Sequence, residues 1–364
     1  MKTTKIVPIK LRSCQYDIFI NENLFDFNSI KKLLRNKKIC IISNETVAPL
    51  YLNRVIEQLN PINSELYSLV LPDGEQYKNQ ESWSKILDFL AEQNFNRSDL
   101  LLSLGGGVIC DMTGFAAASW MRGIDFIQVP TSLLAQVDAS VGGKTGINHS
   151  KGKNLIGAFH QPKAVIINTS TLKTLPLREF KSGLGETLKY GYINQATFIQ
   201  WLKQNSHAIL QQDLSKLTQL IAKCCQFKAQ IVEKDEKESG IRALLNLGHT
   251  FAHAIETYTN YKQYTHGEAV AIGMVMAAEL SVLIKRSDNN LRKELEKNLQ
   301  DFKLLTKLPK DIDAKQLVKL MRLDKKVINK KHRLILIKKF GESFIQTDVC
   351  EKDILQAIKN CQQQ

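Results

Sequence analysis

The sequence predicts an α/β domain built on a parallel sheet, followed by an all-α domain. With 364 residues the chain is too long for one ordinary core and suits two domains. Before about residue 177, short aliphatic runs alternate with helical stretches, which is typical of a parallel sheet with helices on its faces. Beyond it, glycine and β-branched runs give way to long helical patterns. We therefore expect domains at residues 1–177 and 178–364.

Apolar runs in the first half have the length of buried strands. They lie at residues 38–43, 66–71, 99–104 and 126–129. Residues 80–94 repeat apolar side chains at helical spacing, and a second helix is expected at residues 108–120. Because strands and helices alternate in this way, consecutive strands should lie parallel.

The second half reads as a series of helices. They are expected at residues 179–191, 195–211, 214–235, 250–258, 268–286 and 288–302. A short apolar run at 334–338 is the exception, because it has the length of a small strand. Candidate active-site residues fall on both sides of the boundary near residue 177, so we expect a cleft between the two domains.

The composition suits a soluble globular protein rather than a disordered one. Hydrophobic residues make up 43% and charged residues 24%, and the formal net charge is +14. The lysines are spread along the chain, without a compact basic block interleaved with aromatic residues. We therefore expect no nucleic-acid partner. The charge fits attraction of anionic substrates, although a coding bias toward lysine would produce the same balance.

The cysteines and the N-terminal sequence indicate the cytoplasm. There are seven cysteines, an odd number, and no Cys-x-x-Cys pair, which favours reduced thiols over a disulfide framework. The first residues lack the apolar core of a signal peptide, and no uninterrupted apolar run reaches membrane-spanning length. We expect a cytoplasmic protein that does not bind membranes.

Two glycine-bearing stretches suggest anion binding. Residues 105–107 are Gly-Gly-Gly between a predicted strand and a predicted helix, where free amides and the helix dipole favour phosphate. This is not the G-x-G-x-x-G fingerprint, and a tight strand–helix turn is the alternative. Residues 141–146 lack the P-loop spacing, so we reject nucleotide hydrolysis. Lys144, Lys153 and Asn154 are candidate anion contacts, or else solvated surface residues.

A metal site is the second chemical prediction. His249 and His253 lie four residues apart, so they share one face of a predicted helix. His266 begins another apolar helix, and Glu186 follows a glycine turn. Two histidines and one carboxylate would form an open zinc site with three protein ligands. The alternative is packed or capping histidines, because this spacing is not the His-Glu-x-x-His motif.

Over its whole length the sequence resembles the 3-dehydroquinate synthases, members of the sugar phosphate cyclase superfamily. The matching stretches are residues 73–78, 105–111, 130–144, 152–157, 186–191, 246–253 and 266–270. The resemblance implies a dehydroquinate synthase-like fold, with a Rossmann-like NAD-binding domain and a helical metal- and substrate-binding domain. It also implies a homodimer. Cys110 departs from the family, where glycine is usual, and could weaken NAD binding. Leu184-Gly185 also departs from the usual pattern.

The resemblance assigns roles to individual residues. Zinc, with cobalt as a possible substitute, would be held by Glu186, His249 and His266. NAD would contact Asp73, Gly74, Glu75, Gln76, Tyr77, Lys78, Gly107, Val108, Ile109, Cys110, Asp111, Thr131, Ser132, Lys144, Lys153, Thr171, Leu172, Lys173 and Thr174. The substrate would contact Arg122, Asp138, Lys144, Asn154, Lys189, Lys228, Arg242, Asn246 and Lys325 or its neighbour. Catalytic roles fall on Glu238, His253, Lys144 and Asn154. The resemblance thus makes His253 a proton acceptor and not a metal ligand. It therefore replaces the pairing of His249 with His253 by the pairing of His249 with His266.

The implied reaction belongs to the shikimate pathway, which leads to chorismate and the aromatic amino acids. A phosphorylated sugar acid, 3-deoxy-D-arabino-heptulosonate 7-phosphate, gives 3-dehydroquinate and phosphate, so the enzyme is a lyase. NAD would be reduced and reoxidised within each turnover, and zinc would act as a Lewis acid. Lysine and arginine contacts suit the carboxylate and phosphate of this substrate.

Alternative functions remain open on the sequence alone. A related cyclase acting on a sedoheptulose or glucose phosphate would share the fold and both cofactors. Lys228, Arg242 and Asn246 favour a carboxylated substrate, since arginine can hold a carboxylate with two parallel hydrogen bonds. A zinc- or iron-dependent polyol dehydrogenase would share the glycine turn but accumulate NADH. The intact metal-ligand set disfavours a non-catalytic binding protein.

Arg122 poses a geometric problem. It follows the helix that begins at the glycine turn and precedes the next strand, so it should lie at the sheet edge opposite the cofactor. The resemblance nevertheless implies that it contacts the substrate phosphate. Both statements hold if Arg122 reaches the active site of a neighbouring subunit.

Overall fold

The protein divides into two compact units. The computed structural model describes residues 4–23, 25–63, 65–322 and 333–363. The first unit comprises Met1–Leu175 with Leu214–Lys237, and the second comprises Pro176–Asp213 with Glu238–Gln364. The chain therefore leaves the first unit close to the predicted boundary but returns to it for residues 214–237. It returns because helix α7 (Leu214–Val232) packs against strands β1 and β2, so the simple division at residue 177 is incomplete.

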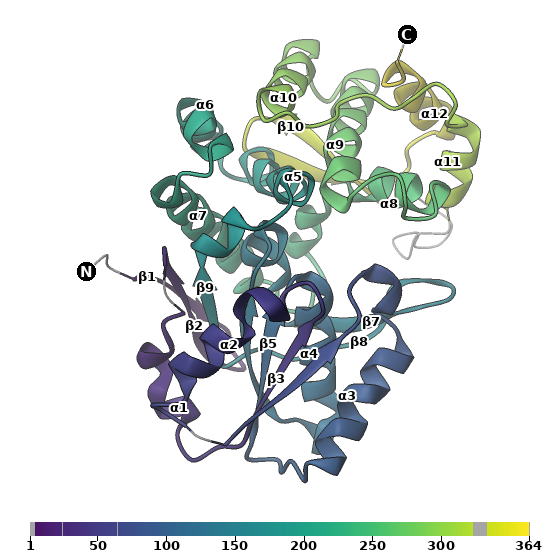
Figure 1. The fold of residues 1–364 in the computed structure, drawn as a ribbon. Helices are drawn as coiled ribbons and strands as arrows, with labels where there is room; N and C mark the ends of the chain where they lie inside the picture. Colours follow the sequence, from purple (N-terminus) through teal and green to yellow (C-terminus); the bar gives the residue numbers. More distant parts are fainter. Residues whose placement is uncertain (1–3, 24, 64, 323–332, 364) are drawn as a thin grey trace. The chain divides into compact units, whose positions relative to one another are not determined.

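The first unit is built on a seven-stranded sheet with the order β1-β2-β9-β6-β5-β3-β4 (Figure 1). The strands are β1 (Lys5–Lys10), β2 (Gln15–Asn21), β3 (Ile39–Asn44), β4 (Leu66–Leu71), β5 (Leu100–Gly105), β6 (Asp125–Pro130) and β9 (Ala164–Asn168). All neighbours pair in parallel except β1 with β2. The predicted parallel sheet is confirmed, and the antiparallel edge strand β1 is an addition to it.

Helices cover both faces of this sheet. Alternate residues of β3 point to opposite sides, as the pleat requires. Ile39 and Ile41 join the core under α1 (Lys31–Leu34) and α2 (Ala48–Leu59). Cys40 and Ile42 join the core under α3 (Gln80–Glu92) and α4 (Gly107–Ser119). Figure 1 shows the two helix pairs on either side of the sheet. The result is a doubly wound, three-layer arrangement.

A small hairpin extends the first unit. Strands β7 (Lys144–His149) and β8 (Gly152–Phe159) pair antiparallel and pack against α4. A π-helical turn, Ala135–Ala139, lies between β6 and this hairpin. After β9, the 3₁₀ turn Thr169–Lys173 follows the last strand of the seven-stranded sheet.

The second unit is mainly helical. Its helices are α5 (Leu177–Ile193), α6 (Ala196–Leu210), α8 (His249–Tyr258), α9 (His266–Leu283), α10 (Asn289–Asp301), α11 (Ala314–Met321) and α12 (Glu351–Asn360). The long helices predicted from the sequence are therefore confirmed. The all-α description needs one correction, because β10 (Leu334–Lys339) and β11 (Glu342–Gln346) form an antiparallel hairpin. The first of these strands matches the run expected at residues 334–338.

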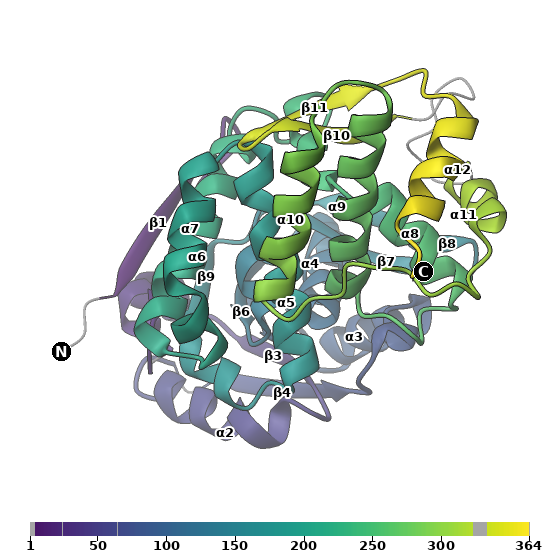
Figure 2. The ribbon, with the colours of Figure 1, turned by 90° about the horizontal axis from the view of Figure 1, so that it is seen from above.

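Helix α9 forms the centre of the second unit. It packs against α5, α8, α10 and α12, and it lies between α8 and α10 in both ribbon views (Figures 1 and 2). Within the described residues it is the one helix long and apolar enough to cross a membrane. However, 78% of it is buried inside the protein, which is the behaviour of a core helix.

Candidate functional site

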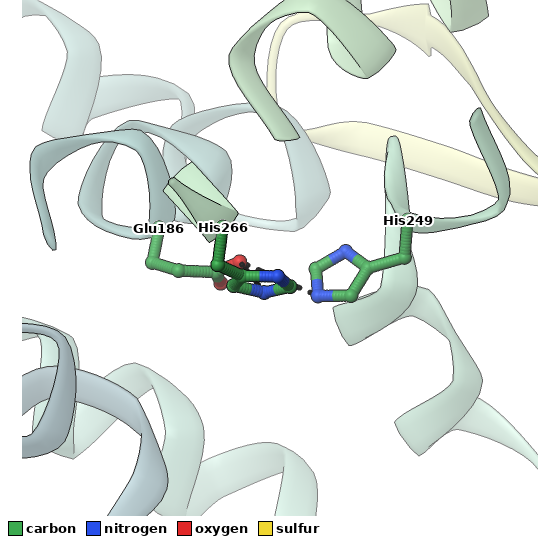
Figure 3. A group of neighbouring side chains, drawn as sticks. All are labelled: Glu186, His249 and His266. Carbon is green, nitrogen blue, oxygen red and sulfur yellow. Dashed lines mark ion pairs between the residues drawn. The ribbon is translucent and has the colours of Figure 1, made fainter. Parts of the chain in front are cut away.

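Glu186 of α5, His249 at the start of α8 and His266 at the start of α9 meet within the second unit. Glu186 Oε1 lies 3.3 Å from His249 Nε2 and 3.4 Å from His266 Nε2. Figure 3 shows the carboxylate and the two imidazole rings directed toward one another. A tetrahedral zinc ion with bonds of about 2.0–2.1 Å separates its ligands by about 3.3 Å. The observed spacing therefore fits zinc, and this group of three is the predicted one.

Both histidines are oriented by a contact from the other ring nitrogen. His249 Nδ1 lies 3.1 Å from the carbonyl oxygen of Leu247, and His266 Nδ1 lies 3.4 Å from Glu256 Oε2. Metal-binding histidines usually donate their second N–H to a carbonyl or carboxylate in this way. Each ring therefore directs Nε2 toward Glu186, where it could hold a metal ion. This role of Glu256 was not predicted from the sequence, because it depends on α8 and α9 lying side by side.

The charges around this group favour a cation. Burial opposes ionisation of Glu186, yet Lys189 and His266 lower its pKa to about 2. Lys189 Nζ bonds Glu186 Oε2, whereas the buried Oε1 faces the Nε2 atoms of His249 and His266. Burial alone would lower the pKa of His266, but Glu256 and Glu186 raise it to about 10. A metal ion must displace that proton, since only neutral imidazole is a ligand.

Glycines allow the three helix segments to approach closely. A Cβ atom on Gly267 would collide with the carbonyl oxygen of Ser182, and one on Gly185 would collide with that of Gly267. Helices α5 and α9 therefore cross backbone to backbone, which brings Glu186 to His266. Gly248 has a φ of 78°, and a Cβ there would lie 2.8 Å from the amide nitrogen of Met274. This left-handed turn sets the start of α8, and hence His249, against α9.

Glu256 gives a direct test of this arrangement. Replacing Glu256 with glutamine should weaken metal binding by about 10- to 100-fold, because His266 loses the carboxylate that orients it. Competition with a chelator, starting from metal-free protein, measures the change. Glu268→Gln is the control. Glu268 caps α9, the helix that begins with His266, and glutamine can keep that capping bond. Unchanged affinity in Glu256→Gln would show that this contact does not support the ligand.

Other predicted residues of the second unit lie near the metal ligands or pair with one another. The His253 ring lies 5.6 Å from that of His249 and 6.3 Å from that of His266, outside the three-ligand group. Asn246 donates a hydrogen bond to Glu238 Oε1. Arg242 is only 1% exposed. Lys325 lies outside the described residues.

The cofactor predictions fall along one edge of the first unit's sheet. The carboxyl ends of its parallel strands lead into the predicted stretches at residues 73–78, 107–111, 131–132 and 171–174. The chain order changes direction between β3 and β5, and this switch point is where open α/β sheets bind ligands. Gly107, Val108 and Ile109 begin α4, so their amides precede the first helical hydrogen bond, from Cys110 to Gly106. Those three amides suit a phosphate group.

Cys110 does not fit the predicted role of a direct cofactor contact. Its amide bonds Gly106 within the helix, and its thiol is fully buried, 3.7 Å from Ser103 Oγ. Burial also raises the pKa of the thiol to about 12. The side chain therefore packs between β5 and α4, and the expected weakening of NAD binding has no structural basis in this position.

The sheet edge also includes a residue that the sequence analysis missed. Asn44 ends β3 beside the switch point and donates a hydrogen bond of 2.6 Å to Asp73 Oδ1. Thr46 Oγ1 donates to the other carboxylate oxygen at 2.7 Å. A polar residue at the end of a fully buried strand was the available signal. Together these bonds hold Asp73 at the carboxyl edge.

The predicted substrate residues of the first unit form two groups and one outlier. Lys228 Nζ bonds Asp138 Oδ1 at 2.8 Å, so these two residues are neighbours. Lys78 Nζ bonds Asn154 Oδ1 at 2.5 Å, which joins a predicted cofactor contact to a predicted substrate contact. Lys144 begins β7, the strand paired with the one that carries Asn154. Arg122 lies apart, just before the amino end of β6.

The fold is shared with two solved synthases that bind NAD⁺ and a metal ion. A 2-deoxy-scyllo-inosose synthase, solved with carbaglucose-6-phosphate, NAD⁺ and Co²⁺, aligns with a TM-score of 0.87 at 23% identity, over 99% of this chain and all of that one. The 2-epi-5-epi-valiolone synthase of Streptomyces hygroscopicus, solved with NAD⁺ and Zn²⁺, gives 0.87 at 21% identity, over 97% of this chain and 98% of that one. The chain therefore shares its fold with these two synthases.

Sequence comparison identifies the family to which the chain belongs. Residues 68–182 match the family model for the 3-dehydroquinate synthase N-terminal region, and residues 183–327 match the C-terminal one. The chain is 48% identical to the 3-dehydroquinate synthase of Shewanella pealeana, over 98% of this chain and 99% of that protein. The chain belongs to the 3-dehydroquinate synthase family and is an enzyme.

Proposed function

We propose that this enzyme converts 3-deoxy-D-arabino-heptulosonate 7-phosphate to 3-dehydroquinate and phosphate, with NAD and zinc as cofactors. The observation that carries the proposal is the Glu186–His249–His266 group at zinc spacing, in a chain of this family. Bound zinc would supply Lewis-acid polarisation of substrate oxygens, and bound NAD a reversible hydride acceptor.

The protein's own residues supply charge and proton acceptors. His253 and Glu238 are the proposed proton acceptors of the second unit, and Asn246 orients Glu238 through its hydrogen bond. The buried Arg242 is a permanent cation suited to the substrate carboxylate. In the first unit, Lys228 is held by Asp138, and Lys144 and Asn154 lie on paired strands. This concentration of cations suits a doubly anionic sugar acid.

The proposed reaction leaves the redox state of the cofactor unchanged. Substrate and products have the same overall oxidation level, so purified enzyme with NAD, zinc and the heptulosonate should release phosphate without accumulating NADH. Phosphate release and nicotinamide absorbance measured on one sample test this expectation. Steady NADH formation in proportion to substrate consumed would identify a polyol dehydrogenase. Phosphate release from a sedoheptulose or glucose phosphate instead would identify another cyclase.

We also propose a cytoplasmic homodimer in which Arg122 contributes to the partner's active site. The seven cysteines are all free thiols, which suits a reducing compartment. Arg122 is exposed beside Met121, which is 47% exposed, and Phe159 on β8 is equally exposed. His160, next to Phe159, bonds the carbonyl of Ile124, so the segments that carry Met121 and Phe159 lie close together in the first unit. Such a surface is suited to a second copy of the chain.

A further inference from the structure

Asn148, a residue without an assigned role, joins three segments of the first unit. Its Oδ1 accepts a hydrogen bond of 2.9 Å from the amide of Asn154. Its Nδ2 donates one of 2.7 Å to Glu75 Oε1, and its backbone amide donates one of 2.8 Å to the carbonyl of Lys78. Asn148 therefore connects the β7–β8 hairpin to residues 75–78, which belong to the predicted cofactor contacts.

The same network fixes the side chain of Asn154. Lys78 is 4% exposed, and its Nζ contacts Asn154 Oδ1 and Asp111 Oδ2, each at 2.5 Å. Burial opposes the charge on Lys78, but Asp111 and Glu75 raise its pKa, so it stays a cation. A lysine ammonium can only donate, so the oxygen of the Asn154 amide must face Lys78. Its Nδ2 then points toward the other side as a donor.

The bond to Asn148 also restrains the backbone at Asn154. Asn154 has a φ of 51°, in the left-handed region, which asparagine adopts more readily than most residues other than glycine. Such conformations persist where neighbouring bonds hold them, and they concentrate at functional sites. The bond from the Asn154 amide to Asn148 is one such restraint. Asn154 itself is exposed, so its side chain can meet a ligand.

We propose that Asn148 is a positioning residue for the reaction. With Lys78, it holds Asn154 so that Nδ2 donates a hydrogen bond to an anionic oxygen of the substrate, and it links this donor to the cofactor loop at Glu75. The proposal rests on the proposed function only in taking Asn154 as a substrate contact. The hydrogen bonds themselves are observed whatever the substrate is.

Exchanging the amide and the carboxylate of the Asn148–Glu75 pair tests the proposal. Asn148→Asp keeps an acceptor for the Asn154 amide but places two carboxylates face to face, and the like charges should separate the loops. Asn148→Asp combined with Glu75→Gln restores one donor and one acceptor with their roles exchanged. Asn148→Ala removes both bonds, and Glu75→Gln alone is the matched reference.

In the full-length enzyme with NAD and zinc, Asn148→Ala and Asn148→Asp should lower kcat by up to about 10²-fold through misplacement of Asn154. The double variant should recover to near the value of Glu75→Gln, whereas a general loss of stability would not be rescued in this way. The NAD dissociation constant and Tm, measured in parallel, separate misplacement from loss of cofactor or fold. Equal activity of Asn148→Ala and wild type, or an unrescued double variant of normal Tm, would overturn the proposal.

Hydrogen exchange provides a readout that does not depend on substrate identity. The amide of Asn154 should exchange slowly in wild type, faster in Asn148→Ala, and slowly again in the double variant. If wild-type enzyme released no phosphate from the heptulosonate, the proposed function would fail while the exchange rates still decided the positioning role. Unchanged exchange in Asn148→Ala would overturn that role.

Discussion

Replacement of His249 by alanine should remove the bound metal and nearly all activity while leaving the fold intact. His249 is one of the three candidate ligands, and its Nε2 lies 3.3 Å from Glu186 Oε1. Without it, two ligands remain for an ion that normally takes three from protein at a catalytic site. Loss of Lewis-acid stabilisation worth several kcal/mol corresponds to a rate decrease of about 10³-fold or more.

Metal content by mass spectrometry, phosphate release and circular dichroism together test this expectation. His253→Ala is the matched control, because His253 lies one turn further along the same helix and outside the ligand group. That variant should keep its zinc, whatever it does to turnover. A His249→Ala enzyme that still bound one zinc ion per chain would exclude the ligand assignment.

The second large effect concerns Arg122 and the partner subunit. Gly105 pairs with Pro130 at the carboxyl edge of the sheet, and Leu100 pairs with Asp125 at the opposite edge. Helix α4 contains 13 residues, so it runs back across about 20 Å before the chain reaches Arg122. Met121, Arg122 and Gly123 all have positive φ, a strained turn of the kind that accumulates at functional sites. Arg122 therefore lies at the edge away from the cofactor turn of its own chain.

In the proposed homodimer, the Arg122→Ala and Glu186→Ala variants should each have little activity, and mixing them should restore activity. The arginine donates charge-assisted hydrogen bonds to phosphate, so its loss should cost about 10²-fold. If Arg122 acts in the partner's site, each mixed dimer has one site with both defects and one with neither. After complete exchange of equal amounts, activity should reach about a quarter of the wild-type value.

The control for this experiment is Arg97→Ala, another exposed arginine that precedes a strand of the same sheet. It should be fully active by itself. A mixture of the Arg122 and Glu186 variants that stays inactive after verified exchange would place Arg122 in its own subunit's site. Normal activity of Arg122→Ala alone would remove its phosphate role.

The sequence predicted those features that depend on local pattern. The strand–glycine–helix step around Gly105 was recognisable because the strand, the turn and the helix are adjacent in the chain. His266 was recognisable as a chemical group at a helix start. Glu186 was expected to follow a glycine turn, but Gly183 and Gly185 lie inside α5, so Glu186 projects from the middle of that helix. Local spacing first suggested pairing His249 with His253, and the resemblance replaced His253 with His266. The structure agrees, since rings four residues apart share a face but need not share an ion.

The missed features all depend on contacts between distant segments. The return of α7 to the first unit is set by its packing on β1 and β2, more than 190 positions away in the chain. Glu256 meets His266 because two helices lie side by side, and Asn148 meets Glu75 because a hairpin folds over a loop. Hydrophobic periodicity carries no information on such partners, since it reports which face is buried and not what covers it.

The backbone crossing of α5 and α9 has a consequence for the choice of metal. Gly185 and Gly267 leave no side chain between the helices, so the distance between Glu186 and His266 is fixed by contact of the main chains themselves. Calcium bonds its ligands at about 2.3–2.6 Å and prefers six to eight oxygen atoms. Such an ion would have to force the two helices apart, and closely packed interiors resist that. The crossing therefore selects ions by radius before any donor preference is considered.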